Sequence, residues 1–307
     1  MSISPPLIAV IGPVEPDLLR AFITHYRDGV GIRDFHLAFH FTEHASRALR
    51  DQLITVCEEM VGPPTVISQG PWHETVHSEL RDHLRVRAGA GWHVIADIDE
   101  FHDYPVPPAE LISAAETAGS PIVGGLLFDR VAQDGSIKPW SPNEGLDKAY
   151  PLGGYLTPKL LGGNPGKIVI AHSSVRLGLG SHRSLDEFPV NRPLVPVHHF
   201  KWRAGILQDL TRRVTEHTKG DWHEKGPWIR NEASALLGHV EQQGGRIDVS
   251  DQRLMFRPAA FGKIPDGWEK DSVDLVAEAM RLCDEHEWSD VLAPIPASEA
   301  QAGELPC

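Results

Sequence analysis

The order of strand and helix patterns in the first hundred residues constrains the fold most. Residues 7–11 form a short continuous apolar run, which is typical of a strand buried on both faces. Residues 35–41 alternate strictly between apolar and other side chains and predict a second strand, and the apolar run 92–97 predicts a third. Helical spacing predicts three helices, which begin at Pro16, begin after Ser46 and cover 73–87. This β-α-β-α-β order predicts an α/β fold with a mostly parallel central sheet and helices on both faces.

The second half of the chain is less regular. Apolar runs predict strands over 122–128 and 167–171, and the Gly- and Pro-rich stretch between them predicts a surface loop. Amphipathic spacing predicts three more helices, over 204–217, 228–243 and about 272–285. Because no clean linker interrupts the chain, we expect one domain over residues 1–292 and a disordered tail over 293–307.

The charge of the chain limits its partners. It carries 29 Lys and Arg against 42 Asp and Glu, a formal net charge of −13 over 307 residues. Nucleic acids and anionic membranes bind clustered basic side chains, so we expect neither as a partner. No apolar run reaches the roughly 18 residues of a membrane span, and residues 7–11 are too short for a secretory signal. The three widely spaced cysteines predict neither a disulfide framework nor a cysteine zinc site, and they favour a cytoplasmic location.

The most informative stretch follows the third predicted strand and reads Asp97-Ile98-Asp99-Glu100-Phe101. Ligands of open α/β sheets bind beyond the carboxyl ends of the strands. Two Asp residues separated by one position at such an end can hold Mg²⁺ or Mn²⁺, with water and phosphate oxygens at the remaining positions. The cation would offset the cost of three neighbouring acids and the charge of a leaving diphosphate. The alternative interpretation is a set of solvated strand-end acids without a function.

Four blocks of the sequence resemble one family. The segment from Trp92 to Phe101 resembles the W-x4-D-x-D-E-F motif of glycosyltransferases with the GT-A fold, in the family-2-like group. The other three blocks are the E-x-x-L-L-x-x-F-x-x-H-Y pattern from Glu15 to Tyr26 followed by Gly29-Val30, the G-x-H segment Gly180-Ser181-His182, and the V-H-H-F-K-W-R block from Val197 to Arg203. Their order and spacing agree with the family over residues 7–250.

The resemblance implies a GT-A fold with a Rossmann-like nucleotide-sugar half at 1–130 and an acceptor half with C-terminal helices at 131–292. It implies a metal-dependent glycosyltransferase, a hexosyltransferase, that uses Mn²⁺ or Mg²⁺ and a UDP- or GDP-sugar. We expect the acceptor to be a hydroxyl of a soluble small molecule, and a homodimer is compatible with the sequence. The donor base, the sugar, the acceptor and the stereochemical outcome stay open.

The same resemblance assigns residues to roles. It implies three metal ligands, Asp97, Asp99 and His182. Residues expected to contact the nucleotide are Gly12, Glu15, Arg81, Arg85, Asp97, His199, Lys201 and Arg203. Arg81 and Arg85 could instead pair with Asp97, since they lie one helical turn apart before the third strand. His199 is preferred to His198 for contact with the site.

The acceptor side is expected at residues 219–232, where Trp222 and Trp228 could stack on sugar rings or nucleobases and the glycines could form a mobile lid. An inverting reaction needs a carboxylate to take the proton of the acceptor hydroxyl. The candidates are Asp221, Glu224 and Glu232. Glu232 is preferred, because it lies one turn beyond Trp228 on an otherwise apolar helix face, although a structural acid is the alternative. A retaining reaction needs no such base.

Two other functions are compatible with an Asp-x-Asp turn. Phosphohydrolases of the haloacid dehalogenase type also place D-x-D after a strand, but they put Thr or Val where this chain has Phe101 and require a later Lys and paired Asp residues. A non-catalytic module that binds nucleotide-sugars is the other alternative. Loss of nucleotide-sugar turnover with EDTA separates both from the main hypothesis.

Overall fold

The computed structural model describes residues 4–184, 187–188, 193–224 and 226–285. The strands are β1 (Leu7–Ile11), β2 (Phe35–Phe41), β3 (Val66–Gln69), β4 (Trp92–Ile95), β5 (Glu100–His102), β6 (Ile122–Val131), β7 (Leu152–Gly154), β8 (Gly166–His172), β9 (Val195–His199) and β10 (Arg257–Pro258). The α-helices are α1 (Pro16–Thr24), α2 (Arg47–Val61), α3 (Glu74–Ala88), α4 (Pro108–Thr117), α5 (Leu146–Ala149), α6 (Ile206–Lys219), α7 (Trp228–Gln242) and α8 (Trp268–Glu285). Shorter helical turns are η1 (His25–Val30), η2 (Thr157–Leu161), η3 (Leu179–Ser181) and η4 (Gln252–Leu254).

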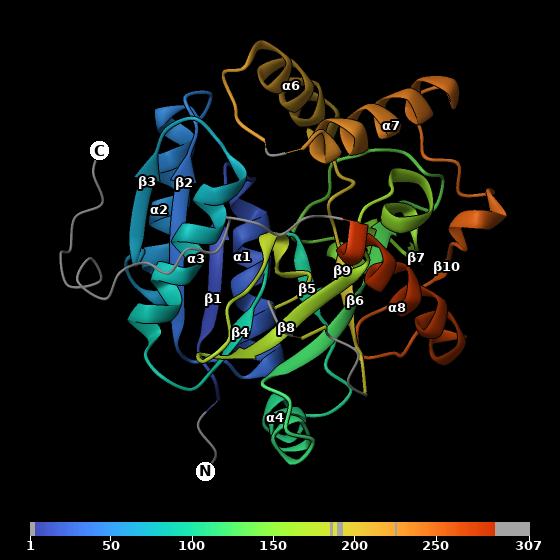
Figure 1. The fold of residues 1–307 in the computed structure, drawn as a ribbon. Helices are drawn as coiled ribbons and strands as arrows, with labels where there is room; N and C mark the ends of the chain where they lie inside the picture. Colours follow the sequence, from blue (N-terminus) through green and yellow to red (C-terminus); the bar gives the residue numbers. More distant parts are fainter. Residues whose placement is uncertain (1–3, 185–186, 189–192, 225, 286–307) are drawn as a thin grey trace.

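These strands form one mixed sheet with helices around it (Figure 1). Its main path runs β10-β7-β6-β8-β4-β1-β2-β3, and the described part of the chain adds β9 beside β6 and β5 beside β9. The pairs β1–β2, β1–β4 and β2–β3 are parallel, whereas β4–β8, β6–β8, β6–β7 and β5–β9 are antiparallel. The predicted α/β class is confirmed, but the sheet is mixed: the strands of the first half pair in parallel, whereas the described pairs of the second half are antiparallel except for the parallel pair β6–β9. Parallel neighbours need a long crossover, usually a helix, and the connection from β6 to β7 contains only the four-residue α5.

The two faces of β1 show how the helices cover the parallel half of the sheet. Leu7, Ala9 and Ile11 pack in the cluster that contains the buried side of α1. The alternate residues Ile8 and Val10 pack in a second cluster that contains the buried side chains of α3. All five β1 residues are buried, which explains the continuous apolar run in the sequence.

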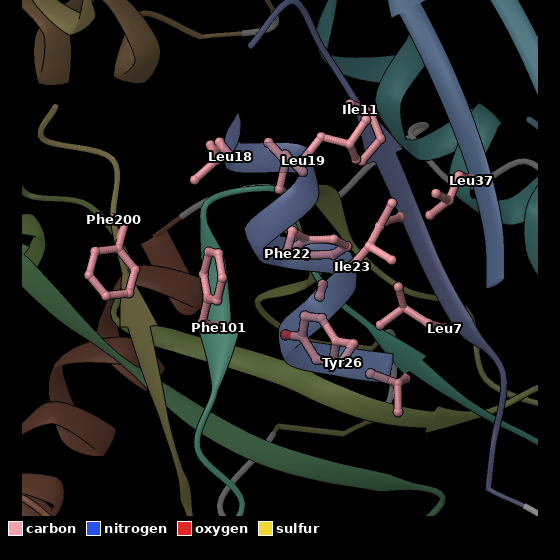
Figure 2. Packing of buried hydrophobic residues seen from close by; sticks show 14 of the residues in the cluster. Leu7, Ile11, Leu18, Leu19, Phe22, Ile23, Tyr26, Leu37, Phe101 and Phe200 are labelled. Carbon is pink, nitrogen blue, oxygen red and sulfur yellow. The ribbon is translucent and has the colours of Figure 1, made fainter. Parts of the chain in front are cut away.

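The helix α1 connects this core to the acidic turn. Figure 2 shows Phe101, which follows the three acids, between α1 and Phe200. The ring centroids of Phe101 and Phe200 are 5.3 Å apart, and those of Phe101 and Phe22 are 6.0 Å apart. Phe101 is almost fully buried. The aromatic residue of the D-x-D-E-F block therefore anchors the turn in the hydrophobic core.

Several elements were not predicted. They are β3, β5, α4, β9 and β10, together with α5, β7 and η2 inside the stretch 132–167 that was expected to be loop. Most are strands of two to five residues, too short for a clear periodic pattern. The expected tail 293–307 lies outside the described residues. Within the described residues, no helix is both long enough and apolar enough to cross a membrane.

The His25-Tyr26 pair at the start of η1 holds the backbone of β5. The Tyr26 hydroxyl donates to the carbonyl of Glu100 at 3.0 Å and accepts from the amide of His102 at 3.2 Å. The His25 imidazole lies 3.0 Å from the carbonyl of His102. These contacts fix the strand that follows the acidic turn. His25 and Tyr26, at the end of the Glu15–Tyr26 pattern, therefore have a structural role.

We expect His25 to make the protein sensitive to acid. Burial lowers the pKa of His25 to about 4, whereas an unfolded chain titrates near its ordinary value of about 6.5. The unfolded state therefore binds more protons between these values, and stability falls as the pH drops through that window. The free energy of unfolding in urea should fall between pH 7 and pH 4.5 in both proteins, and it should fall by about 1 to 2 kcal/mol less in His25→Gln than in wild type. The exposed His223→Gln is the control, and an unchanged slope in His25→Gln would contradict the expectation.

Candidate active site

The acidic turn between β4 and β5 has a fixed backbone. The amide of Glu100 donates to the carbonyl of Asp97 at 2.9 Å, and the amide of Phe200 donates to the carbonyl of Asp99 at 2.8 Å. Antiparallel pairing places Glu100 opposite His199 in the neighbouring strand β9. The turn thus lies at the carboxyl end of β4, with the end of β9 beside it.

A buried lysine in β8 neutralises two of the three acids. The Lys167 ammonium lies 2.9 Å from Asp97 Oδ2 and 2.8 Å from Glu100 Oε1. It also donates to the carbonyl of Gly180 at 2.7 Å. The side chains of Lys167 and Glu100 are each only 4% exposed, whereas that of Asp97 is 33% exposed, so Asp97 is the member of this cluster that water reaches. Lys167 therefore compensates Asp97 and Glu100 with a charge that belongs to the protein itself.

The pKa values of this cluster follow from burial and pairing. Burial alone raises the pKa of Asp97, but the charge of Lys167 outweighs it and holds the pKa below its usual range. Burial also raises the pKa of Glu100, which stays elevated despite Lys167 because Asp97 adds a second negative charge. Burial would lower the pKa of Lys167, yet the two carboxylates raise it above its ordinary value. His77 Nε2 lies 3.5 Å from Asp97 Oδ1, so Asp97 is engaged on both oxygens.

The third acid of the turn, Asp99, faces a histidine. His199 Nε2 lies 3.9 Å from Asp99 Oδ2, and His199 Nδ1 lies 2.9 Å from Oδ1 of the fully buried Asp129. Asp129 also accepts from the amide of Thr157 at 2.7 Å, from its hydroxyl at 2.8 Å and from Trp202 Nε1 at 2.8 Å. Burial raises the pKa of Asp129, but these donors outweigh it and lower the pKa overall. The hydrogen bond to Asp129 likewise raises the pKa of His199 against the effect of burial.

The carboxylate behind His199 fixes its orientation. Because Nδ1 is used by Asp129, Nε2 is the ring nitrogen that faces Asp99. A carboxylate behind the imidazole is the arrangement that orients histidine ligands of metal ions. His198, the alternative in the sequence, points elsewhere: it is buried beside Arg130 at 2.9 Å and Asp103 at 3.4 Å. His199 is therefore the histidine of this block that lies at the acidic turn.

The three predicted metal ligands do not meet at one point. Within the described residues, Asp97, Asp99 and His182 do not form a group whose ligand atoms all lie within 4.8 Å of one another. Asp97 is held by Lys167, and His182 Nδ1 lies 2.6 Å from the carbonyl of Gly166. Burial, with Lys167 next, lowers the pKa of His182 to about 4 and keeps the ring neutral. Asp99 and His199 are the pair that the structure places face to face.

The loop that carries His182 is held by Arg81. The guanidinium donates at 3.0 Å to the carbonyls of Leu177 and Gly178 and to the Ser181 hydroxyl. Gly180 has a φ of +60°, and a Cβ there would lie 2.7 Å from His182 Nε2. Glycine is thus required at this position by both conformation and space.

Arg85 has a similar role one turn later. It donates to the carbonyls of Val175 at 2.9 Å and His172 at 2.8 Å. The sequence predicts that Arg81 and Arg85 reach phosphates or pair with Asp97. In the structure, both guanidinium groups instead donate to the segment after β8. Asp97 pairs with Lys167 instead, because β8 runs beside β4 and brings that lysine to the turn.

Basic residues after β9 lie beside the site. Lys201 forms an ion pair with Glu232 of α7, and Arg203 pairs with Glu15 at 3.1 Å. Burial raises the pKa of Glu232, but Lys201 outweighs it and lowers the pKa. Burial dominates the lowered pKa of His182 and the charge of Glu232 opposes it, so Glu232 of α7 lies near His182. Gly12, expected at the nucleotide, follows β1 and has open space where a Cβ would lie.

The other two acid candidates have neighbours outside the acidic turn. Glu224, in the segment before α7, pairs with Arg230 in the first turn of α7. Asp221 lines a cleft of about 750 Å³ at the ends of β2 and β3, together with Glu43 and Lys219. Of the three predicted bases, Glu232 is the one whose partner, Lys201, belongs to the block that carries His199.

Of the two tryptophans expected to stack on a substrate, Trp222 and Trp228, the first packs inside the protein. Trp222 is buried, and its ring centroid lies 6.2 Å from that of Trp72 and 5.8 Å from that of His217. Its Nε1 donates to Glu43 at 3.1 Å. Trp222 is therefore a packing residue under the C-terminal end of α6, because the Gly220 turn folds it back onto the helix, whereas Trp228 is 36% exposed.

Two residues that organise the site were not identified from the sequence. Lys167 begins an apolar strand, and Asp129 lies near the end of the entirely buried strand β6. A charged residue within a strand buried on both faces requires a partner. That signal was present for both residues, but the sequence does not say which strands are neighbours.

Known proteins provide little further information. No protein-family model matches the chain, and no curated protein matches it. S. aureus TarS 1-349 is 10% identical, with 80% of this chain and 77% of that chain covered at a TM-score of 0.30. A putative glucose-1-phosphate thymidylyltransferase from Bacillus anthracis is 9% identical, with 94% and 98% covered at a TM-score of 0.27. A UDP-glucose pyrophosphorylase complexed with UDP-glucose is 8% identical, with 92% and 100% covered at a TM-score of 0.24. TM-scores this low do not bear on function, which must be inferred from the site itself.

Proposed function

We propose that the chain is a metal-dependent glycosyltransferase of the GT-A type. It moves a hexose from a UDP- or GDP-sugar to a hydroxyl of a small-molecule acceptor. The observation that carries the proposal is the pair Asp99 and His199, which face each other at 3.9 Å at the carboxyl end of β4. Asp129 behind His199 and the Lys201–Glu232 pair beside it supply the groups that such a reaction needs.

The residues present fit a divalent cation. Asp99 offers a carboxylate that is 24% exposed, and His199 offers the ring nitrogen Nε2, oriented by the contact of Nδ1 with Asp129. Mg²⁺ and Mn²⁺ bind in this way, with few protein ligands and several positions left for water and phosphate oxygens, and an imidazole favours Mn²⁺. The bound cation would neutralise charge on the diphosphate leaving group. His182 remains a second candidate ligand, because its Nε2 is free of the Gly166 carbonyl that holds Nδ1.

The remaining residues bind and orient the substrates. Lys201 is the cation closest in sequence to His199, and an ammonium group binds phosphate oxygens well. Glu232 would accept the proton of the acceptor hydroxyl if the reaction inverts the anomeric centre. Lys167 keeps Asp97 and Glu100 in position without the metal, since it pairs with both.

The direct test is turnover of nucleotide-sugars. Purified protein is incubated with UDP- and GDP-hexoses and MnCl₂, and release of nucleoside diphosphate is followed with and without EDTA. We expect turnover of one donor class that disappears with EDTA and returns with added Mn²⁺. Turnover that persists unchanged in EDTA would contradict the metal-dependent mechanism.

One observation favours a second candidate. Asp97 lies 2.9 Å from the Lys167 ammonium, and haloacid-dehalogenase-type phosphohydrolases require a lysine beside the aspartates of their D-x-D turn. In this chain, however, Phe101 follows the acids as a core residue, and Asp97 is held from two sides. Hydrolysis of p-nitrophenyl phosphate, without turnover of nucleotide-sugars, would identify this alternative. Nucleotide-sugar binding without turnover of either substrate would identify a non-catalytic module.

A further inference from the structure

The ion pair between Lys201 and Glu232 joins two parts of the site. Lys201 follows β9 and Glu232 belongs to α7, and their side chains are 16% and 25% exposed. The Lys201 ammonium lies 4.9 Å from the ring centroid of Trp202, whose Nε1 donates to the buried Asp129. Lys201 therefore stands on the same Asp129-centred support as His199, whereas Glu232 approaches from a separate helix.

Lys201 differs from the other cations around the acidic turn. Lys167 is enclosed by two carboxylates and a carbonyl, and Arg81 is occupied by backbone carbonyls and a hydroxyl. Arg203 pairs with Glu15 and donates to the Phe200 carbonyl. Lys201, among the described residues, has one oxygen partner, the partly exposed carboxylate of Glu232. It is thus the cation that an incoming anion can reach by replacing a single partner.

We propose that the diphosphate of the donor and the Glu232 carboxylate compete for Lys201, so that donor binding releases Glu232 for the acceptor. This inference rests on the function proposed above and adds a residue-level device to it: the ion pair of Lys201 and Glu232 is what the donor must break. A diphosphate beside Asp99 and His199 lies two residues along the chain from Lys201 and carries more negative charge than one carboxylate. Before donor binding, Lys201 holds Glu232 and keeps it from the acceptor hydroxyl.

The group transfer balances with Glu232 as the proton acceptor. The acceptor oxygen forms a bond to the anomeric carbon, and the bond from that carbon to the diphosphate oxygen breaks. The bonding electron pair leaves with the nucleoside diphosphate, which Lys201 now contacts, and the hydroxyl proton passes to the freed Glu232 carboxylate. The products are the glycosylated acceptor, the nucleoside diphosphate and one proton, which Glu232 returns to water.

Competition makes an unusual prediction for Glu232→Gln. Removal of the competing charge should strengthen binding of UDP or GDP in the presence of MnCl₂ by roughly three- to tenfold, measured by isothermal titration calorimetry. Sugar transfer should fall at least about 100-fold, because the proton acceptor is lost. A residue with only a structural role would not improve donor binding while it abolishes turnover. Glu59→Gln, which breaks the exposed pair of Arg20 and Glu59 at 3.0 Å on α1 and α2, is the matched control and should change neither quantity.

A double-mutant cycle completes the test. Lys201→Met should weaken binding of the same nucleotide, and Glu232→Gln should then have no further effect in the Lys201→Met background. The competition is overturned if Glu232→Gln binds the nucleotide as wild type does or more weakly. It is also overturned if Glu232→Gln strengthens nucleotide binding equally in the Lys201→Met background. In both cases the proposed function stands. If wild-type protein binds neither UDP nor GDP with Mn²⁺, the proposed function fails and the inference fails with it.

Discussion

Asp99→Asn is expected to abolish sugar transfer while the protein stays folded. The substitution keeps the size of the side chain but removes the negative charge that faces His199 Nε2. Loss of a group that stabilises charge in the transition state costs roughly 10² to 10³ in rate. Because Asp99 is 24% exposed and its side chain is not among those held by Lys167, thermal stability should change little. The measurements are the initial rate of nucleoside diphosphate release and the midpoint of thermal unfolding.

The exposed Asp221→Asn is the control for this variant. Both substitutions neutralise an acid that the sequence placed near the substrate, but Asp221 lines the separate cleft at the ends of β2 and β3. Asp221→Asn should retain near wild-type turnover. Equal turnover of Asp99→Asn and wild type would contradict the assignment of Asp99. A loss of turnover in both Asp99→Asn and Asp221→Asn would show that the effect is not specific to Asp99.

Lys167→Met is expected to produce the largest loss of stability. The substitution leaves Glu100, whose side chain is 4% exposed, and Asp97 without the cation that pairs with both. Removing one partner of a buried ion pair costs about 3 to 5 kcal/mol, because the other charge stays buried and unpaired. Urea unfolding at pH 7.5 measures the difference. A loss below about 1 kcal/mol, as for a surface pair, would contradict the role of Lys167.

The pH dependence of this variant identifies the stranded charge. The pKa of Glu100 is already raised in the folded protein by burial, so a neutral Glu100 is accessible as the pH falls. The folded state then takes up a proton more readily than the unfolded state, and its stability deficit should shrink between pH 7.5 and pH 5. The double variant Lys167→Met with Glu100→Gln should recover part of the lost stability at pH 7.5. A deficit independent of pH and unrelieved by Glu100→Gln would mean that packing, not charge, is lost.

Strong periodic signals predicted the first half of the fold well. The strict alternation of residues 35–41 corresponds to β2, and Ser46 caps α2 by accepting from the amide of Leu49 at 3.2 Å. The continuous apolar runs of β1 and β4 reflect their burial between two helical layers. These local patterns are sufficient because burial on one face or on both leaves a regular apolar pattern within the element's own sequence.

Pairing between distant strands could not be predicted in the same way. Lys167 reaches Asp97 only because β8 runs antiparallel to β4, and His199 reaches Asp99 only because β9 pairs with β5. Both β5 and β9 are short, and their sequences do not identify the strand with which each pairs. The sequence therefore identified the acidic turn and the His198-His199 block as candidates, while the lysine that compensates the turn and the aspartate behind His199 required the topology.

The proposed metal ligands are Asp99 and His199, and spectroscopy can identify these ligands directly. Mn²⁺ bound to the protein in the presence of UDP or GDP is measured by pulsed electron paramagnetic resonance, which detects a directly bound imidazole nitrogen. We expect a nitrogen coupling that is lost in His199→Asn and retained in His182→Asn, and we expect Mn²⁺ binding itself to be lost in Asp99→Asn. Nitrogen coupling that survives in His199→Asn, or Mn²⁺ binding unaffected by Asp99→Asn, would contradict this assignment.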